Sequence, residues 1–186
     1  PPRKRTHTPS GRRFNAFILD EDDKPHNPMI NAGAILSAAI IRSRFRSSVD
    51  AFKAIKNFIE KCVGGVAPVA FDNTIYLSEL NNAERNLALA YFMREKSAFL
   101  KEKVPDMTSV LETYFQACSI TVDVRAHSIM AATLAAGGTC PVTCERVMEP
   151  DHARNTLQLM YNCGMYDSSG RFCFEVRVYV CVRASM

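Results

Sequence analysis

The segment 24–35, Lys-Pro-His-Asn-Pro-Met-Ile-Asn-Ala-Gly-Ala-Ile, constrains the fold of this chain more than any other stretch. Asn27 before Pro28 predicts a helix start, because an asparagine amide caps free backbone N–H groups and proline at the first helical position loses a donor that has no partner there. Asn31 then lies in the first turn, where its amide can both donate and accept hydrogen bonds. The small residues 32–34 leave room for another backbone to approach closely. The segment therefore indicates either a capped helix that packs through small residues or a site for a ligand with an amide or an α-amino acid end.

Apolar periodicity and capping signals predict that most of the chain is helical. The expected helices cover, in order, 28–41, 52–62, 83–96, 106–118, 124–136 and 150–163. Ser48 is the expected cap of the second helix and Gly64 its stop, and the fourth helix has an apolar face that includes Cys118. Alternation and β-propensity predict strands at 14–19 and 172–182, the second of which would return the chain to a sheet.

Length and composition indicate one domain-sized core. The chain has 186 residues, 47% of them hydrophobic, which is enough for such a core but leaves no second domain. The net charge of +4 is concentrated in residues 1–13, which hold five basic residues and no acidic one, so the rest of the chain is nearly neutral. Because no aromatic residues are interleaved with these charges and prolines accompany them, we expect 1–13 to be a flexible or wrongly assigned lead-in rather than a nucleic-acid contact.

The cysteines indicate reduced thiols rather than a metal site. Their number is odd, most stand in apolar patterns, and they occupy the positions Cys62, Cys118, Cys140, Cys144, Cys163, Cys173 and Cys181. This usage favours an intracellular, reducing compartment. Cys140-Pro-Val-Thr-Cys144 has no second Cys or His pair at zinc spacing, so we expect neither a metal nor a cofactor. No apolar run reaches the length that spans a bilayer, so no membrane span is expected.

Five short motifs follow one another in order along the chain. They are the segment 24–35; Ser78-Glu79 with Glu84-Arg85-Asn86; Tyr-Phe-Gln-Ala-Cys-Ser-Ile at 114–120; Met-Ala-Ala-Thr-Leu-Ala at 130–135 with Gly137-Gly138; and Arg-Asn-Thr at 154–156 leading to Cys-Gly-Met-Tyr-Asp at 163–167. This ordered set, which covers 9–174, resembles the glutaminases, serine-dependent amidohydrolases that convert L-glutamine into L-glutamate and ammonia. The resemblance is to the phosphate-activated eukaryotic forms, of kidney and liver type, and to related bacterial forms.

The resemblance implies an α+β fold, namely the mostly helical part of a serine β-lactamase and penicillin-binding-protein-like fold, with edge strands from a truncated sheet. Residues 14–176 are expected to form part of the catalytic domain, and 177–186 a divergent tail. In such folds the nucleophile comes from a Ser-x-x-Lys motif, yet no serine of this chain has lysine three residues later. In the family that motif lies upstream of the first match, and a Ser-Gly segment of the oxyanion site lies downstream of the last. We therefore expect a central fragment of a glutaminase, without turnover by these residues alone.

The resemblance also implies which residues bind glutamine. This substrate presents an ammonium, a carboxylate and an amide, which need an acid, neutral donors and an oxyanion hole, respectively. Carried over residue by residue, glutamine binding falls on Asn31, Glu79, Asn86, Tyr114 and Tyr166. Glu79 would face the α-ammonium, while Tyr114 and Tyr166 are the expected catalytic residues beside the reacting serine. The simpler alternatives are that Glu79 is solvated in the first turn of a helix and that Tyr114 packs in the core.

Two further stretches concern regulation and assembly. Residues 12–18, Arg-Arg-Phe-Asn-Ala-Phe-Ile, resemble the family's Leu-Arg-Phe-Asn-Lys-Leu-Phe gating loop, but Ala16 stands in place of its lysine, so loop-based activation and inhibitor response are expected to differ. Leu87 and Tyr91 share a helix face that resembles the family's dimer-to-dimer contact, the alternative being that both are buried within one subunit. The family further implies a homotetramer, inorganic phosphate as an activator and a mitochondrial location, with the cytoplasm as the alternative.

Three functions of different classes remain open. The first is a glutaminase whose serine and lysine lie outside this chain. The second is a non-catalytic homologue that binds glutamine or assembles with full-length subunits. The third is another serine acyl enzyme of the β-lactamase class that shares only the fold, which predicts cleavage of a β-lactam and indifference to glutamine.

Overall fold

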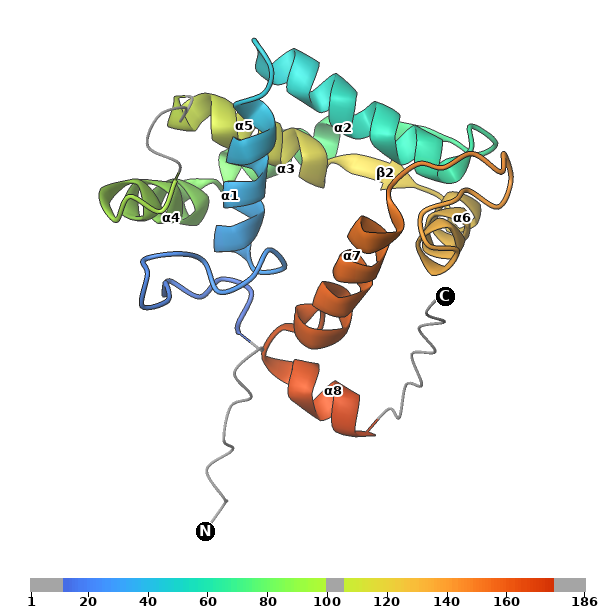
Figure 1. The fold of residues 1–186 in the computed structure, drawn as a ribbon. Helices are drawn as coiled ribbons and strands as arrows, with labels where there is room; N and C mark the ends of the chain where they lie inside the picture. Colours follow the sequence, from blue (N-terminus) through green and yellow to red (C-terminus); the bar gives the residue numbers. More distant parts are fainter. Residues whose placement is uncertain (1–11, 100–105, 176–186) are drawn as a thin grey trace.

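The computed structural model describes residues 12–99 and 106–175, which form a helical framework with a small two-stranded sheet (Figure 1). In chain order the elements are α1 (Asn31–Arg42), α2 (Ser48–Val63), β1 (Val69–Phe71), α3 (Asn73–Asn81), α4 (Glu84–Glu95), α5 (Met107–Cys118), β2 (Ile120–Val122), α6 (Val124–Ala135), α7 (Pro150–Cys163), the short 3₁₀ helix η1 (Tyr166–Ser168) and α8 (Ser169–Glu175). The predictions for 1–11, for a strand beyond 175, for the tail from 177 and for Cys181 lie outside the described residues.

The helices with strong periodicity match the prediction. Those expected over 83–96, 106–118, 124–136 and 150–163 are confirmed to within one residue at each end. Gly64 ends α2 in the left-handed conformation, at φ 69°, as expected of a glycine stop. Asp106 caps α5, because its side chain accepts a hydrogen bond from the Ser109 N–H at 3.2 Å.

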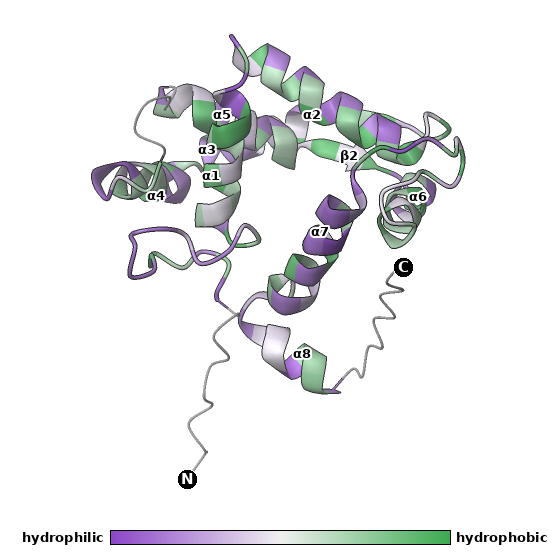
Figure 2. Cartoon of the chain, viewed as in Figure 1, coloured by the Kyte–Doolittle hydropathy of each residue, from purple (hydrophilic) through white to green (hydrophobic). Residues whose placement is uncertain are grey.

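The larger hydrophobic core lies where α1 crosses α5 (Figure 1). α1 buries Ile35 and Ala39 there, and α5 buries Val110 and Phe115, each at 5% exposure or less. Figure 2 shows that hydrophobic colours prevail along α1, as suits a helix at the centre of a core. The predicted apolar face of α5 is confirmed except at Cys118, which is exposed.

A second, smaller core joins α2, β1 and α6. Val63, Val69 and Ala126 are buried in it. Thr133 of α6 is fully buried and donates a hydrogen bond from Oγ1 to the Cys62 carbonyl oxygen of α2 at 2.8 Å. This bond satisfies a polar group inside the core and fixes α6 against α2.

The start of α1 and the cap of α2 differ from the prediction by a few residues. Asn27 does act as a cap, since its Oδ1 accepts from the N–H groups of Met29 at 2.9 Å and Ile30 at 3.2 Å, but these bonds organise a turn and the helix begins at Asn31. Ser47, not Ser48, caps α2, because its Oγ accepts from the N–H of residue 50 at 3.1 Å. Both differences reflect caps that sit outside the periodic part of a helix.

The strands differ more. Residues 14–19 form a loop rather than a strand: the Ala16 N–H donates to the Arg13 oxygen at 3.0 Å, and the ring of Phe17 packs 4.7 Å from that of Phe92. β1 and β2, which pair antiparallel, were not predicted, because three residues are too few for alternation to show.

The region 172–175 is helical, so the β prediction for it is wrong. Its residues close α8, whose start is fixed by Ser169, which accepts from the Met165 N–H at 3.1 Å. An ion pair between Arg171 and Glu175, with a 2.7 Å Nε–Oε1 contact one helical turn apart, supports the helix further. These local bonds override the β-propensity of the apolar residues between them. The unpredicted α3 is likewise set by a cap, Asp72, whose side chain accepts from two N–H groups.

Gly33 allows α1 to pack against its own capping turn. A Cβ at this position would lie 1.9 Å from the Asn27 carbonyl oxygen and 2.7 Å from the Pro28 Cα. Both contacts are with backbone, which cannot move aside without displacing the turn.

We expect Gly33→Ala to lower the free energy of unfolding by about 2–3 kcal/mol, because the new methyl overlaps backbone. Urea unfolding followed by circular dichroism measures this. The control is Gly65→Ala, where φ is 68° but nothing lies within 4 Å of the new Cβ, so a loss of about 1 kcal/mol is expected. Equal losses in the two variants would contradict the importance of the contact at Gly33.

Candidate functional site

Three asparagine side chains meet at the N-terminal end of α1. Asn31 is 2% exposed, and its Nδ2 donates to Oδ1 of Asn15 at 3.0 Å and to Oδ1 of Asn86. Its backbone N–H donates to the Phe14 carbonyl oxygen at 2.9 Å. A loop, α1 and α4 therefore converge on one amide.

The side-chain oxygen of Asn31 has no hydrogen-bond partner among the described residues, although it is buried. Leaving such an acceptor unpaired costs about 1–3 kcal/mol. Because Nδ2 already donates to two asparagine oxygens, Oδ1 is the end of the amide that remains able to bind a ligand. The arrangement thus offers a buried acceptor for an ammonium or amide N–H.

Tyr114 of α5 has its ring in the core and its hydroxyl among polar groups. The residue is 8% exposed, and its ring lies 5.6 Å from that of Phe115. Burial raises the pKa of Tyr114 well above its ordinary range. Three neighbours raise it further: Cys118, whose sulfur accepts a hydrogen bond from the phenol, then Glu79 and Tyr166. The phenol is therefore protonated at neutral pH and can donate a hydrogen bond without becoming an anion.

Tyr166 is held in an uncommon backbone conformation. Its φ is 50°, the left-handed region that a residue with a bulky side chain rarely occupies. Ser169 Oγ donates to its carbonyl oxygen at 2.8 Å, and the ring of Phe14 meets its ring edge to face, with centroids 5.2 Å apart. Next to it, Asp167 pairs with Arg13 at 3.7 Å. Strain of this kind clusters at functional sites.

The predicted site residues form two groups. The asparagine group holds Asn31 and Asn86, and the tyrosine group holds Glu79, Tyr114 and Tyr166. Phe14 joins the groups, since its carbonyl accepts from the first and its ring packs on the second. Glu79 is half-buried near the end of α3, so the alternative of a solvated first turn is wrong. The alternative that Tyr114 packs in the core is correct for its ring, whereas its hydroxyl lies near polar groups. The roles of the five residues in binding and catalysis stay predictions.

Sequence reasoning missed two neighbours of the site. Asn15 lies in the 12–18 loop and Cys118 in the motif 114–120, and neither is among the predicted site residues, yet each contacts one of them through its side chain. Both lie within stretches that carry the resemblance, so proximity in sequence to a motif was the available signal. Their contacts come from tertiary structure and have no pattern of their own.

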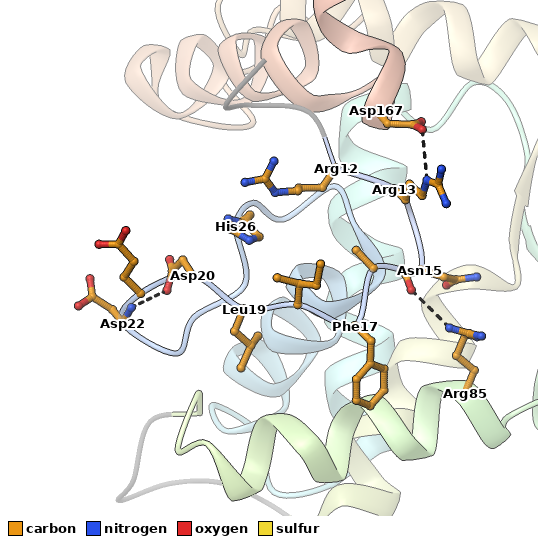
Figure 3. Close-up of a pocket in the computed structure, with 13 residues that line it drawn as sticks. Arg12, Arg13, Asn15, Phe17, Leu19, Asp20, Asp22, His26, Arg85 and Asp167 are labelled. Carbon is orange, nitrogen blue, oxygen red and sulfur yellow. Dashed lines mark hydrogen bonds and ion pairs between the residues drawn. The ribbon is translucent and has the colours of Figure 1, made fainter. Parts of the chain in front are cut away.

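A hollow of about 1040 Å³ is lined mainly by residues of the 12–26 loop, whose side chains Figure 3 shows. It is lined by charged and apolar side chains: Arg12, Arg13, Asn15, Ala16, Phe17, Ile18, Leu19, Asp20, Glu21, Asp22, His26, Arg85 and Asp167. None of the five predicted residues lines it, but Asn15 is shared with the asparagine group. Burial and then the Arg12 guanidinium lower the pKa of His26, although Asp20 opposes this. His26 Nε2 in the hollow and Asn31 Oδ1 are both buried without a hydrogen-bond partner among the described residues. We place the candidate site at the asparagine and tyrosine groups, because all five predicted residues lie there.

Two observations limit other kinds of site in the described part of the chain. No group of three or more His, Cys, Asp or Glu side chains there is arranged to hold a metal ion. None of its helices is both long enough and apolar enough to cross a membrane.

Comparison with known proteins identifies the family. The Glutaminase family model matches residues 3–180, so the chain belongs to the glutaminase family. The mitochondrial liver isoform of glutaminase from Rattus norvegicus is 43% identical over 168 residues, and a glutaminase from Nostoc is 32% identical over 171. A crystal structure of Bacillus glutaminase in 4.3 M NaCl superposes with a TM-score of 0.80 at 29% identity, over 90% of this chain.

The matches cover most of this chain but a smaller share of its relatives. The chain spans 27% of the rat protein, 49% of the Nostoc protein and 55% of the Bacillus chain. The likeness to bacterial glutaminases confirms the predicted α+β, mostly helical, β-lactamase-like fold. It also argues against the third hypothesis, a β-lactamase-class enzyme that shares only the fold.

We expect Tyr114→Phe to reduce the loss of stability at alkaline pH. Because folding raises the pKa of this phenol, stability is retained below the ordinary tyrosine pKa of about 10 and falls as pH rises above it, where the unfolded chain releases the proton first. Urea unfolding of wild type and variant at about pH 8 and about pH 11 measures the change. An equal fall in both proteins would contradict the burial of the hydroxyl.

Proposed function

We propose that this chain contributes the glutamine-binding part of a glutaminase, which hydrolyses L-glutamine to L-glutamate and ammonia. The observation that carries the proposal is the buried Oδ1 of Asn31, which lacks a partner among the described residues while its Nδ2 is held by Asn15 and Asn86. Glutamine has N–H donors at its ammonium and at its amide, either of which fits this acceptor. Membership of the glutaminase family supports the same substrate.

The five predicted residues are proposed to contact different chemical groups of the substrate. The carboxylate of Glu79 would face the α-ammonium, and Asn31 and Asn86 would bind polar groups of the ligand. Tyr114 and Tyr166 would stand beside the reacting carbon, where a protonated phenol donates to developing charge. The position of Glu79 near the Tyr114 hydroxyl supports placing these groups around one ligand.

The nucleophile is proposed to come from a Ser-x-x-Lys motif outside this chain. The lysine would take the serine proton, the serine Oγ would attack the amide carbon, and the C–N bond would break as ammonia leaves with a proton. Water would then cleave the resulting ester, which releases glutamate and restores the serine.

The alternative function is that of a non-catalytic homologue that binds glutamine or joins full-length subunits.

Assembly, activation and location are proposed from the family. Leu87 and Tyr91, 39% and 51% exposed on α4 and one turn apart, support a contact between subunits of a homotetramer. The names of the rat and mouse liver isoforms support a mitochondrial location. Organelle fractionation tests the location, and ammonia release with and without inorganic phosphate tests phosphate as the activator.

We expect Leu87→Glu to dissociate the oligomer of the natural polypeptide that contains this chain, because a carboxylate replaces apolar area at the contact. Sedimentation velocity gives the assembly size. Val66→Glu, at a position 40% exposed outside the helices, is the control and should leave the size unchanged. A wild-type monomer, or a Leu87→Glu protein of wild-type size, would rule out this contact.

We expect Glu79→Gln to weaken glutamine binding at least ~10-fold, because the ammonium loses its charged partner. Calorimetric titration of L-glutamine into the natural polypeptide measures this, and an ammonia assay follows turnover. The matched control is Glu95→Gln, at an exposed position on α4, which should bind as wild type does. Wild type that neither binds nor hydrolyses glutamine would overturn the proposal, and binding without ammonia release would support the non-catalytic alternative.

A further inference from the structure

Asn15 contacts the proposed ligand-binding amide from the 12–26 loop. Its Oδ1 accepts from Asn31 Nδ2 at 3.0 Å, and its backbone oxygen accepts from Arg85 Nη1 at 3.5 Å (Figure 3). The adjacent Phe14 carbonyl accepts from the Asn31 backbone N–H at 2.9 Å. Asn15 therefore meets the side chain, and its neighbour the main chain, of the same residue.

Two hydrogen bonds fix a carboxamide in a way that one does not. With Asn86 alone, the amides of Asn31 and Asn86 could turn together, which keeps a hydrogen bond between them and presents the nitrogen of Asn31 to the ligand in place of its oxygen. With both Nδ2 hydrogens directed at the oxygens of Asn15 and Asn86, the plane of the amide is set. The oxygen of the Asn31 amide is then turned away from both asparagines, and it has no hydrogen-bond partner among the described residues.

We propose that Asn15 is a positioning residue: it holds Asn31 so that Oδ1, rather than Nδ2, faces the N–H groups of the ligand. The inference rests on the proposed function, because it takes Asn31 as a contact of glutamine. Through the hydrogen bond between Asn15 and Asn31, the loop would then increase the affinity for the substrate. A ligand without an N–H donor gains nothing from this orientation.

The 12–26 loop is also held by contacts that do not involve Asn15. The effect of Asn15 on the orientation of Asn31 can therefore be distinguished from an effect on the attachment of the loop. Lys24 Nζ donates to the carbonyl oxygens of Ser97 at 3.0 Å and Ala98 at 3.1 Å. The ring of Phe17 packs 4.7 Å from that of Phe92. Removing the Asn15 side-chain oxygen leaves these contacts in place, so the loss falls on the orientation of Asn31 rather than on the fold.

The test compares Asn15→Ala with Asn15→Asp in the natural polypeptide that contains this chain. Alanine removes the acceptor, and we expect the Kd for L-glutamine to rise about 10-fold, as for one lost hydrogen bond to a buried group. Aspartate keeps an oxygen for Asn31 Nδ2 and should stay within about 2-fold of wild type. Where turnover is measurable, KM should rise in Asn15→Ala while kcat is kept, and the urea midpoint should stay close to that of wild type. Asn57→Ala, on the exposed side of α2, is the control.

The possible outcomes distinguish failure of the positioning role of Asn15 from failure of the proposed function. If wild type binds glutamine and Asn15→Ala binds equally well, or if Asn15→Asp is as weak as Asn15→Ala, the positioning role is overturned and the proposed function stands. If wild type binds no glutamine, the proposed function is overturned. In that case NMR of the Asn31 side-chain NH₂ still tests the orientation: two sharp proton signals are expected in wild type and Asn15→Asp, with exchange broadening in Asn15→Ala. Unchanged signals in Asn15→Ala would overturn the inference independently.

Discussion

The contact between the first turn of α1 and its own capping turn is the constraint on which the site depends. The carbonyl of Asn27 lies where a side chain at Gly33 would begin, and the Asn27 amide closes the turn before the helix. This packing fixes the direction of α1. One end of the helix is thereby set in the core against α5, and the other presents Asn31 to the loop and to α4.

The fold was predictable where the pattern was long. Helices such as α5 and α7 have several turns of periodic apolar residues and recognisable ends, so their limits follow from sequence. β1 and β2 have three residues each and exist because they pair with each other, which no local pattern encodes. The loop over 14–19 alternates like a strand, yet its backbone bonds to a turn and to Asn31.

The site was predictable from motifs but not from chemistry alone. Asn31 and Tyr114 occupy positions where capping or core packing would be sufficient explanations, and the resemblance singled them out. Their partners came from tertiary structure: Asn15 is brought to Asn31 from 16 residues away in sequence, and Cys118 meets the Tyr114 hydroxyl one helical turn on. Such contacts depend on side-chain direction and depth, which one-dimensional spacing does not specify.

The asparagine group carries no net charge, unlike the pairs at the outer edge of the loop. Hydrogen bonds between neutral amides depend on direction and are little affected by dissolved ions, whereas an exposed ion pair such as that of Arg13 with Asp167 weakens as ions accumulate. The orientation of Asn31 is therefore insulated from ionic strength. A rise in salt concentration therefore weakens the ion pair of the loop at concentrations that leave the hydrogen bonds of the Asn31 amide intact.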